Sequence, residues 1–172
     1  LTGTATAALL RREANIGLRN RKPETPGLAG KRLVRVEFAV YGRKSLITNH
    51  SETTGARRFE ASPWIAFSPP GPKTPSVVWL DRRLHRSAQI KCSTAQPVIE
   101  AALSGFGFCV LPCFIGDAES GLGRASGVIA ELGHDQWLVS HDDDRHSKPI
   151  KLVSRKLAGL MQSHQRLFSG QI

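Results

Sequence analysis

Residues 88–111 constrain the fold more than any other part of the chain, because three element patterns follow one another there without a gap. Residues 88–93 have the pattern of a strand, and residues 94–104 have apolar residues paired at i,i+4, as in a helix, with Gly105 at its end. Residues 106–111 form a continuous apolar run, which is typical of a strand in a sheet covered on both faces. This order predicts an α/β fold with largely parallel pairing.

The same alternation of strands and helices continues along the rest of the chain. Apolar and polar residues alternate with period two over residues 33–41, which predicts a single half-buried strand. Its buried face would comprise Val34, Val36, Phe38 and Val40. Residues 151–168 predict a helix, whose apolar stripe comprises Val153, Leu157, Leu160, His164 and Phe168. Further helices are predicted over residues 6–14 and 75–84, further strands over 15–19, 64–67, 128–132 and 136–140, and loops over 21–30 and 116–127.

Composition and charge exclude some classes of protein and leave others open. Of the 172 residues 40% are hydrophobic, which excludes a disordered or collagen-like chain. No apolar stretch approaches the roughly 20 residues that cross a bilayer, so an integral membrane protein is excluded and no membrane partner is expected. The net charge of +10 favours an anionic partner, although an Arg-rich surface without such a partner explains it equally well. No zinc pair, RNA-binding aromatic motif or helix-turn-helix accompanies the charge, so direct nucleic-acid binding by residues 1–44 is the weakest functional hypothesis.

The three cysteines, Cys92, Cys109 and Cys113, are odd in number, and two of them lie in apolar runs. This pattern argues against a disulfide framework and favours the reducing cytoplasm. Cys109 and Cys113 would be about 13 Å apart in an extended strand, beyond disulfide reach. Buried packing cysteines are therefore expected rather than a redox pair, although a turn between them would shorten that distance.

Candidate catalytic chemistry is sparse. Residues 141–146 offer two imidazoles and three carboxylates, but their spacing matches no stereotyped metal site and they resemble an exposed turn. The sequence contains no nucleophile elbow of the kind that serine hydrolases use. The glycines around Phe106 follow a predicted helix rather than precede one, so they do not match the glycine-rich motif that binds dinucleotides. We therefore expect no enzymatic activity, no catalytic residues, no metal and no cofactor.

Two polar helix entrances fit a binding protein better. Ser93 and Thr94 end one predicted strand and open a helix, where hydroxyls and unpaired backbone N–H groups hold anions. Thr2 lies similarly just ahead of the first predicted helix. Two such entrances facing one cleft would suit a carboxylate-bearing ligand. The alternative interpretation of these hydroxyls is ordinary N-capping.

Three blocks of the chain resemble the effector-binding domain of LysR-type transcriptional regulators. The first block runs from Arg11-Arg12-Glu13-Ala14-Asn15-Ile16-Gly17-Leu18-Arg19 through Pro23 and Gly27-Leu28 to Phe38-Ala39-Val40-Tyr41. The second is residues 101–112, similar to the family's "aaGlGiallP" segment, and the third is residues 137–149, ahead of the last helix. The blocks occur in the family's order and span nearly the whole chain.

The resemblance implies a fold of the type II periplasmic-binding-protein kind, with two Rossmann-like lobes joined by crossing strands and an effector between them. Lobe I would combine residues of about 1–41 with about 128–172, and lobe II would be about 42–127. The family's effector contacts carry over to Thr2, Asn20, Ser93, Thr94, Leu111 and Pro112.

The chain departs from the family's pattern in two ways. Asn15 stands where an Asp is usual. The family's opening strand–helix–strand unit and its winged helix-turn-helix do not precede Leu1, so the resemblance implies an N-terminally truncated domain with an incomplete lobe I. The strands over residues 15–19 and 136–140 would then lack a neighbour.

The resemblance implies the sensory part of a transcriptional regulator. The expected partner is a small-molecule effector, with a carboxylate as the candidate class, and the expected assembly is a homodimer or higher homo-oligomer. DNA would be bound only through the absent N-terminal domain, and the location would be cytoplasmic. The alternative from another class is a stand-alone periplasmic-type solute-binding protein.

Overall fold

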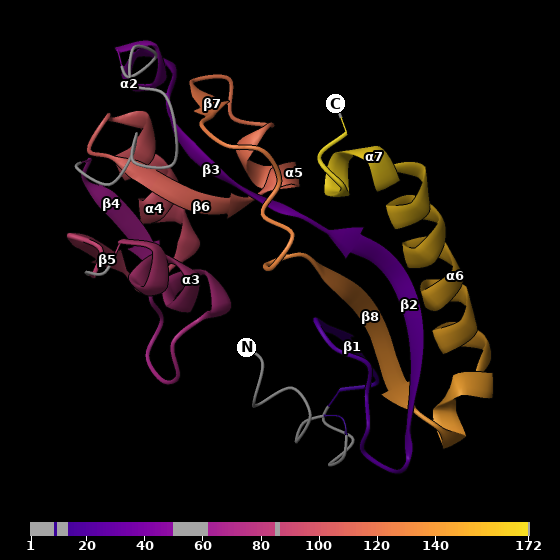
Figure 1. Cartoon of the computed structure of the whole chain (residues 1–172). Helices are drawn as coiled ribbons and strands as arrows, with labels where there is room; N and C mark the ends of the chain where they lie inside the picture. Colours follow the sequence, from indigo (N-terminus) through magenta and orange to yellow (C-terminus); the bar gives the residue numbers. More distant parts are fainter. Residues whose placement is uncertain (1–8, 10–13, 50–61, 85–86, 172) are drawn as a thin grey trace. The chain divides into compact units, whose positions relative to one another are not determined.

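The computed structural model describes residues 9, 14–49, 62–84 and 87–171, and the helix predicted over residues 6–14 lies almost wholly outside them. The chain divides into two compact units (Figure 1). Unit 1 combines Leu1–Val36 with His134–Ile172, and unit 2 is Glu37–Gly133. Each unit has its own sheet and its own hydrophobic core.

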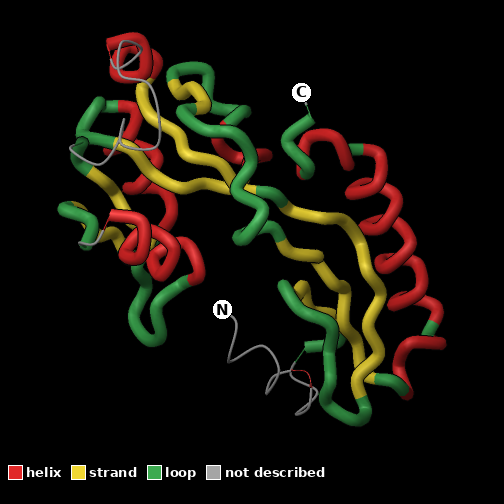
Figure 2. The backbone as a smooth tube through the Cα atoms, viewed as in Figure 1, coloured by secondary structure: helices red, strands yellow, loops and turns green. Residues whose placement is uncertain are grey.

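The sheet of unit 1 has three antiparallel strands in the order β1-β8-β2 (Figure 2). The strands are β1 (Ile16–Arg19), β8 (His134–His141) and β2 (Leu28–Val36). The segments predicted as strands over residues 15–19 and 136–140 therefore pair with each other, and the expectation that both lack a neighbour is wrong. The loop predicted over residues 21–30 also ends early, because β2 begins at Leu28.

The C-terminal helix is broken at His164 into α6 (Lys148–Ser163) and α7 (Gln165–Phe168). In the predicted stripe, Val153 is 44% and Leu160 59% exposed, so that part of the prediction is wrong. Helix α6 instead buries Ile150 and Ala158 and packs Leu157 and Met161 toward Leu33 and Leu138 of the sheet. The sequence contains two overlapping apolar stripes, and the position of the sheet decides which one is buried.

Unit 2 has a five-stranded sheet in the order β5-β4-β6-β3-β7. Strand β4 pairs in parallel with β5 and β6, whereas β3 is antiparallel to β6 and β7. The expectation of largely parallel pairing thus holds only for three of these strands. The strands are β3 (Phe38–Arg43), β4 (Trp64–Phe67), β5 (Ile90–Cys92), β6 (Phe108–Pro112) and β7 (Leu122–Arg124).

Both faces of this sheet are covered. One face carries a cluster that includes Tyr41, Ile65 and Cys109 and packs on α4 (Ala95–Leu103). The other face carries a cluster that includes Val40 and Trp64 and packs on α3 (Pro75–Leu84). The predictions of α3, of β4 and of the β5–α4–β6 order are confirmed. The shorter helices of this unit are α2 (Lys44–Asn49) and α5 (Cys113–Gly116).

The single strand predicted over residues 33–41 is wrong, because it is two strands in two different sheets. Strand β2 ends at Val36 in unit 1 and β3 begins at Phe38 in unit 2, with Glu37 between them. Strand β3 lies between β6 and β7 in its sheet, and Ala39 and Tyr41 are buried together with Val40. Apolar alternation continues across the junction and therefore does not mark where one sheet ends.

The elements predicted between β6 and β8 are also wrong. Residues 128–132 form an irregular segment that ends in a turn rather than a strand, and their apolar character reflects the burial of Ile129 and Leu132 in the core. The Ile129 N–H donates to Phe38 O at 2.7 Å, which holds this segment against β3. The loop predicted over residues 116–127 contains β7, a strand too short to show a period-two pattern.

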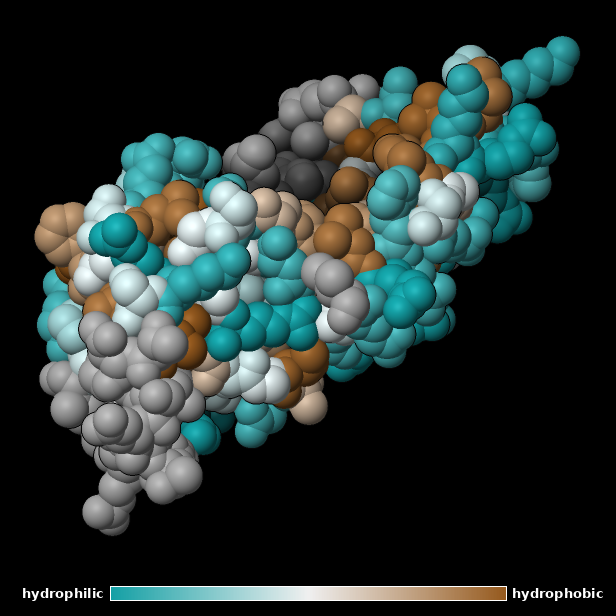
Figure 3. Space-filling view, turned by 90° about the horizontal axis from the view of Figure 1, so that it is seen from above, coloured by the Kyte–Doolittle hydropathy of each residue, from teal (hydrophilic) through white to brown (hydrophobic). Residues whose placement is uncertain are grey.

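The surface is mostly polar on the face that Figure 3 shows, with separate apolar patches. Among the described residues, no helix combines the length and apolar character that crossing a membrane requires.

Candidate functional site

The candidate site of unit 2 lies where its parallel strands end. Because β5, β4 and β6 run in parallel and are adjacent, their last residues, Cys92, Phe67 and Pro112, lie at one edge of the sheet. Phe38, the first residue of antiparallel β3, pairs with Pro112 at the same edge. In open α/β sheets, ligands bind outside the carboxyl ends of the strands.

Ser93 and Thr94 connect β5 to α4 and are both exposed at this edge. Thr94 is the N-cap residue of α4 with an extended backbone (φ −125°, ψ 159°), but its side chain makes no capping hydrogen bond. The N-capping alternative is therefore wrong for the Thr94 hydroxyl. The hydroxyl lies beside the positive end of a helix dipole, where an anion is stabilised.

Leu111 and Pro112 are the last two residues of β6 and lie one strand away from β5. The Leu111 side chain is 4% exposed and packs in the core, so this residue can offer only its backbone to a ligand. Pro112 is half-buried and is followed by the Cys113 N–H, which donates to Glu37 O at 2.8 Å. The structure thus brings four of the six predicted contacts to one sheet edge.

The other two predicted contacts are not among the described residues of unit 2. Asn20 directly follows β1 and is exposed, and it belongs to unit 1. Thr2 lies outside the described residues.

A partly buried polar network in unit 2 joins residues that no local sequence pattern connects. The Tyr41 hydroxyl donates to Asp117 Oδ1 at 2.9 Å, and Arg124 Nε donates to the same oxygen at 2.7 Å. A second Arg124 nitrogen donates to Asp117 Oδ2, which makes the pair bidentate. Burial, followed by the hydrogen bond to Asp117, raises the pKa of Tyr41, so its hydroxyl stays protonated and serves as a donor. The network ties β3, the segment after α5, and β7 together.

The cysteines are free thiols held in the core. Cys109 and Cys113 are both fully buried in the cluster that packs on α4. Burial raises the pKa of Cys109 to about 12, and it also raises the pKa of Cys113. Because the thiolate is the reactive form, burial lowers the reactivity of both thiols at neutral pH.

The acidic and histidine-rich segment after β8 forms the short helix η2 (Asp143–His146). Its residues pair locally, Arg145 with Asp142 at 3.1 Å and His141 with Asp143 at 3.4 Å. In the part of the chain that the structure describes, no group of three or more His, Cys, Asp or Glu side chains could hold a metal ion.

Known structures share this fold. The regulatory domain of CrgA from Neisseria meningitidis matches with a TM-score of 0.67 and 19% identity, over 90% of this chain and 78% of that one. The apo regulatory domain of HypT from Salmonella typhimurium matches with a TM-score of 0.70 and 14% identity, over 95% and 80%. CbnR in complex with its target DNA matches with a TM-score of 0.69 and 13% identity over 94% of this chain, but the chain spans only 57% of that regulator.

No protein with curated annotation matches the chain. The family model of the LysR substrate binding domain matches residues 1–161, almost the whole length. This match does not favour the alternative of a stand-alone solute-binding protein. The chain belongs to the LysR substrate-binding domain family, the effector-sensing part of LysR-type transcriptional regulators.

Proposed function

We propose that the chain binds a small carboxylate at the edge where β5, β4 and β6 end. We also propose that it is the sensory part of a regulator that binds DNA through another domain. The observation that carries this proposal is the pair Ser93 and Thr94, exposed ahead of α4 with the Thr94 hydroxyl unused by the helix. Two hydroxyls and the first N–H groups of a helix match the acceptor oxygens of a carboxylate.

The remaining expected contacts complete this proposal. The backbone of Leu111 and the ring of Pro112 would border the ligand from the neighbouring end of β6. Asn20 and Thr2 would contribute from the other lobe, with units 1 and 2 corresponding to lobes I and II. The ligand would then act by favouring one arrangement of the lobes over another.

The proposal also covers the activity, the assembly and the cellular location of the domain. The domain would be regulatory and non-enzymatic, would act as a homodimer or higher homo-oligomer, and would work in the cytoplasm, where its three free cysteines stay reduced. Specific DNA binding would require the further domain, because phosphate attraction by scattered Lys and Arg carries no base readout.

A thermal-shift screen of the full-length regulator against small organic acids tests the site. We expect at least one acid to raise the melting temperature, and Ser93→Ala combined with Thr94→Val to abolish that increase. Ser104→Ala is the matched control, because Ser104 is an exposed hydroxyl at the opposite end of α4. If the double variant keeps the full shift of the best acid, the site assignment is wrong.

A further inference from the structure

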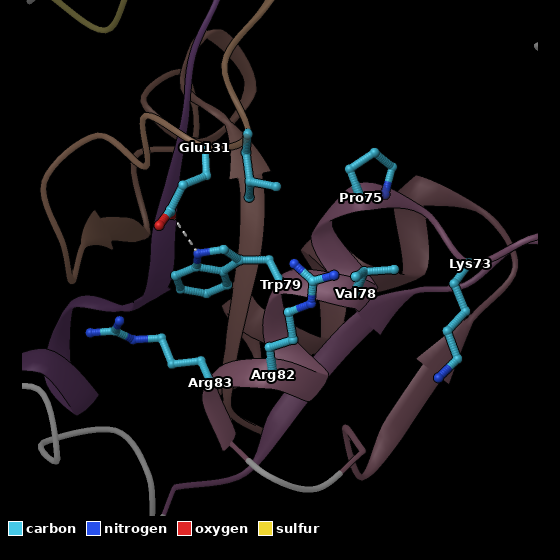
Figure 4. Close-up of a pocket in the computed structure, with 8 residues that line it drawn as sticks. Lys73, Pro75, Val78, Trp79, Arg82, Arg83 and Glu131 are labelled. Atoms are coloured by element: carbon cyan, nitrogen blue, oxygen red, sulfur yellow. Dashed lines mark hydrogen bonds between the residues drawn. The ribbon is translucent and has the colours of Figure 1, made fainter.

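A groove of about 500 Å³ lies on unit 2 (Figure 4). It is on the face of the sheet that α3 covers, opposite the face that α4 covers. Helix α3 supplies Val78, Trp79, Arg82 and Arg83 to it, and the turn before β8 supplies Glu131 and Leu132. Its volume lies within the range of small-molecule pockets, about 300–1,000 Å³. The groove is separate from the strand ends, because α3 and α4 cover different faces.

Trp79 forms a fixed wall of this groove. Its indole N–H donates to Glu131 Oε2 at 2.9 Å, which sets the plane of the ring. The Arg83 guanidinium carbon lies 5.5 Å from the ring centroid, a cation–π distance. Figure 4 shows the indole between the Glu131 carboxylate and the arginines of α3. The ring therefore presents a flat apolar surface whose orientation is already set before a ligand arrives.

The charge of the groove is positive and in part uncompensated. Lys73 pairs with Asp81 at 2.6 Å. The Glu131 carboxylate accepts the indole hydrogen bond but keeps its negative charge, so it offsets only one of the two arginines that line the groove. Arg82 and Arg83 are exposed, and neither forms an ion pair with a carboxylate of the described residues. An exposed guanidinium next to an aromatic wall offers bidentate hydrogen bonds to a carboxylate and a stacking surface to a planar ring.

We propose that this groove binds a small planar aromatic carboxylate, with its ring on Trp79 and its carboxylate on Arg82. The apolar side chains of Val78 and Leu132 border the ring, and Arg83 contributes favourable charge from the far side of the indole. An aliphatic acid lacks the stacking surface, and a neutral arene lacks the charge. The groove therefore selects for a ligand that has both.

The test follows the three tryptophan indole N–H signals of the full chain by NMR while naphthoate is added. Trp79→Phe identifies the Trp79 signal. We expect this signal to move and saturate, and Arg82→Gln to weaken the affinity about ten-fold, as the loss of one charge-assisted pair predicts. Arg155→Gln, at an exposed arginine of α6, is the matched control and should keep the affinity.

Two further ligands and one variant separate the contributions. Naphthol has the ring but no carboxylate, and acetate has the carboxylate but no ring. Each should bind at least about ten-fold more weakly than naphthoate. Naphthoate should still move the Trp79 signal in the Ser93→Ala, Thr94→Val variant, because the groove does not use those hydroxyls. The inference is overturned if naphthoate leaves the Trp79 signal unmoved, if Arg82→Gln binds it equally well, or if naphthol binds as tightly.

Discussion

Gly116 lies directly against the ring of Tyr41, and a Cβ placed on Gly116 would overlap Cε1 and Cζ of that ring. The close approach allows the buried Tyr41 hydroxyl to reach Asp117, the next residue along the chain. A glycine at the end of α5 is therefore required by packing rather than by backbone conformation.

Gly116→Ala should destabilise unit 2 by about 1–3 kcal/mol, the usual cost of forcing an extra methyl group into a packed core. The free energy of unfolding in urea measures this effect. Gly159→Ala is the control, because a Cβ there meets nothing within 4 Å and α6 should gain helix propensity. Equal stability of Gly116→Ala and the parent chain would show that the Tyr41 ring can move away freely.

Asp117→Asn should also destabilise unit 2, by about 1–3 kcal/mol, because it removes the charge that Arg124 pairs with in a partly buried site. The Asp117 side chain is only 10% exposed, so solvent screens the pair poorly. Asp142→Asn is the matched control in an exposed pair with Arg145 and should cost less than about 1 kcal/mol. Urea unfolding of both variants measures the difference, and similar losses would contradict a special role for the Tyr41 network.

Stability should fall as the pH rises above about 9. Burial raises the pKa of Cys109 from 9.0 to about 12, so above pH 9 the unfolded chain loses this proton while the folded chain keeps it. The stabilisation is fully present below pH 9 and is lost progressively up to about pH 12, at about 1 kcal/mol per pH unit for one proton. Cys113, whose pKa is also raised, acts in the same direction.

Urea unfolding of the chain at pH 8 and pH 10 measures this loss. Cys109→Ala should reduce it by about 1 kcal/mol, because the variant has no thiol to ionise at that position. Cys92→Ala should keep the full loss, since Cys109 is then intact. A loss of the same size in Cys109→Ala would rule out the buried thiol as its source.

Unit 1 should open more readily than unit 2. The described residues of unit 1 include fewer buried hydrophobic side chains than those of unit 2. The core cluster of unit 1 joins Leu33, Leu138 and Ala158, whereas two larger clusters cover the two faces of the sheet in unit 2. Regions with few buried apolar contacts open at lower free energy. Amide hydrogen exchange should therefore be faster in β1, β2 and β8 than in β3, β4 and β6. Uniform slow exchange over both sheets would contradict this prediction.

Helices α3 and α4 and strand β4 could be predicted because their signals are local. Pro75 opens α3, Gly105 follows the end of α4 with φ +83°, and apolar periodicity marks the residues between. The common edge of Ser93, Thr94, Leu111 and Pro112 follows from the parallel order of β5 and β6, which the strand–helix–strand pattern also predicted. The helices and β4 depend on neighbours within a few residues, which is the range over which backbone propensity acts, whereas the common edge also requires β4 to pair with both β5 and β6.

The tertiary structure alone decided the features that depend on pairing between distant residues. Apolar and polar residues alternate without a break across Glu37, yet β2 and β3 on either side of it belong to different units. The strand with which each one pairs, β8 for β2 and β6 for β3, decides the sheet to which it belongs. The sheet of unit 1 selects Ile150 and Ala158 over Val153 and Leu160 as the buried stripe of α6. The contacts of Tyr41 with Asp117 and of Trp79 with Glu131 join residues far apart in the chain, and no local pattern marks either of them.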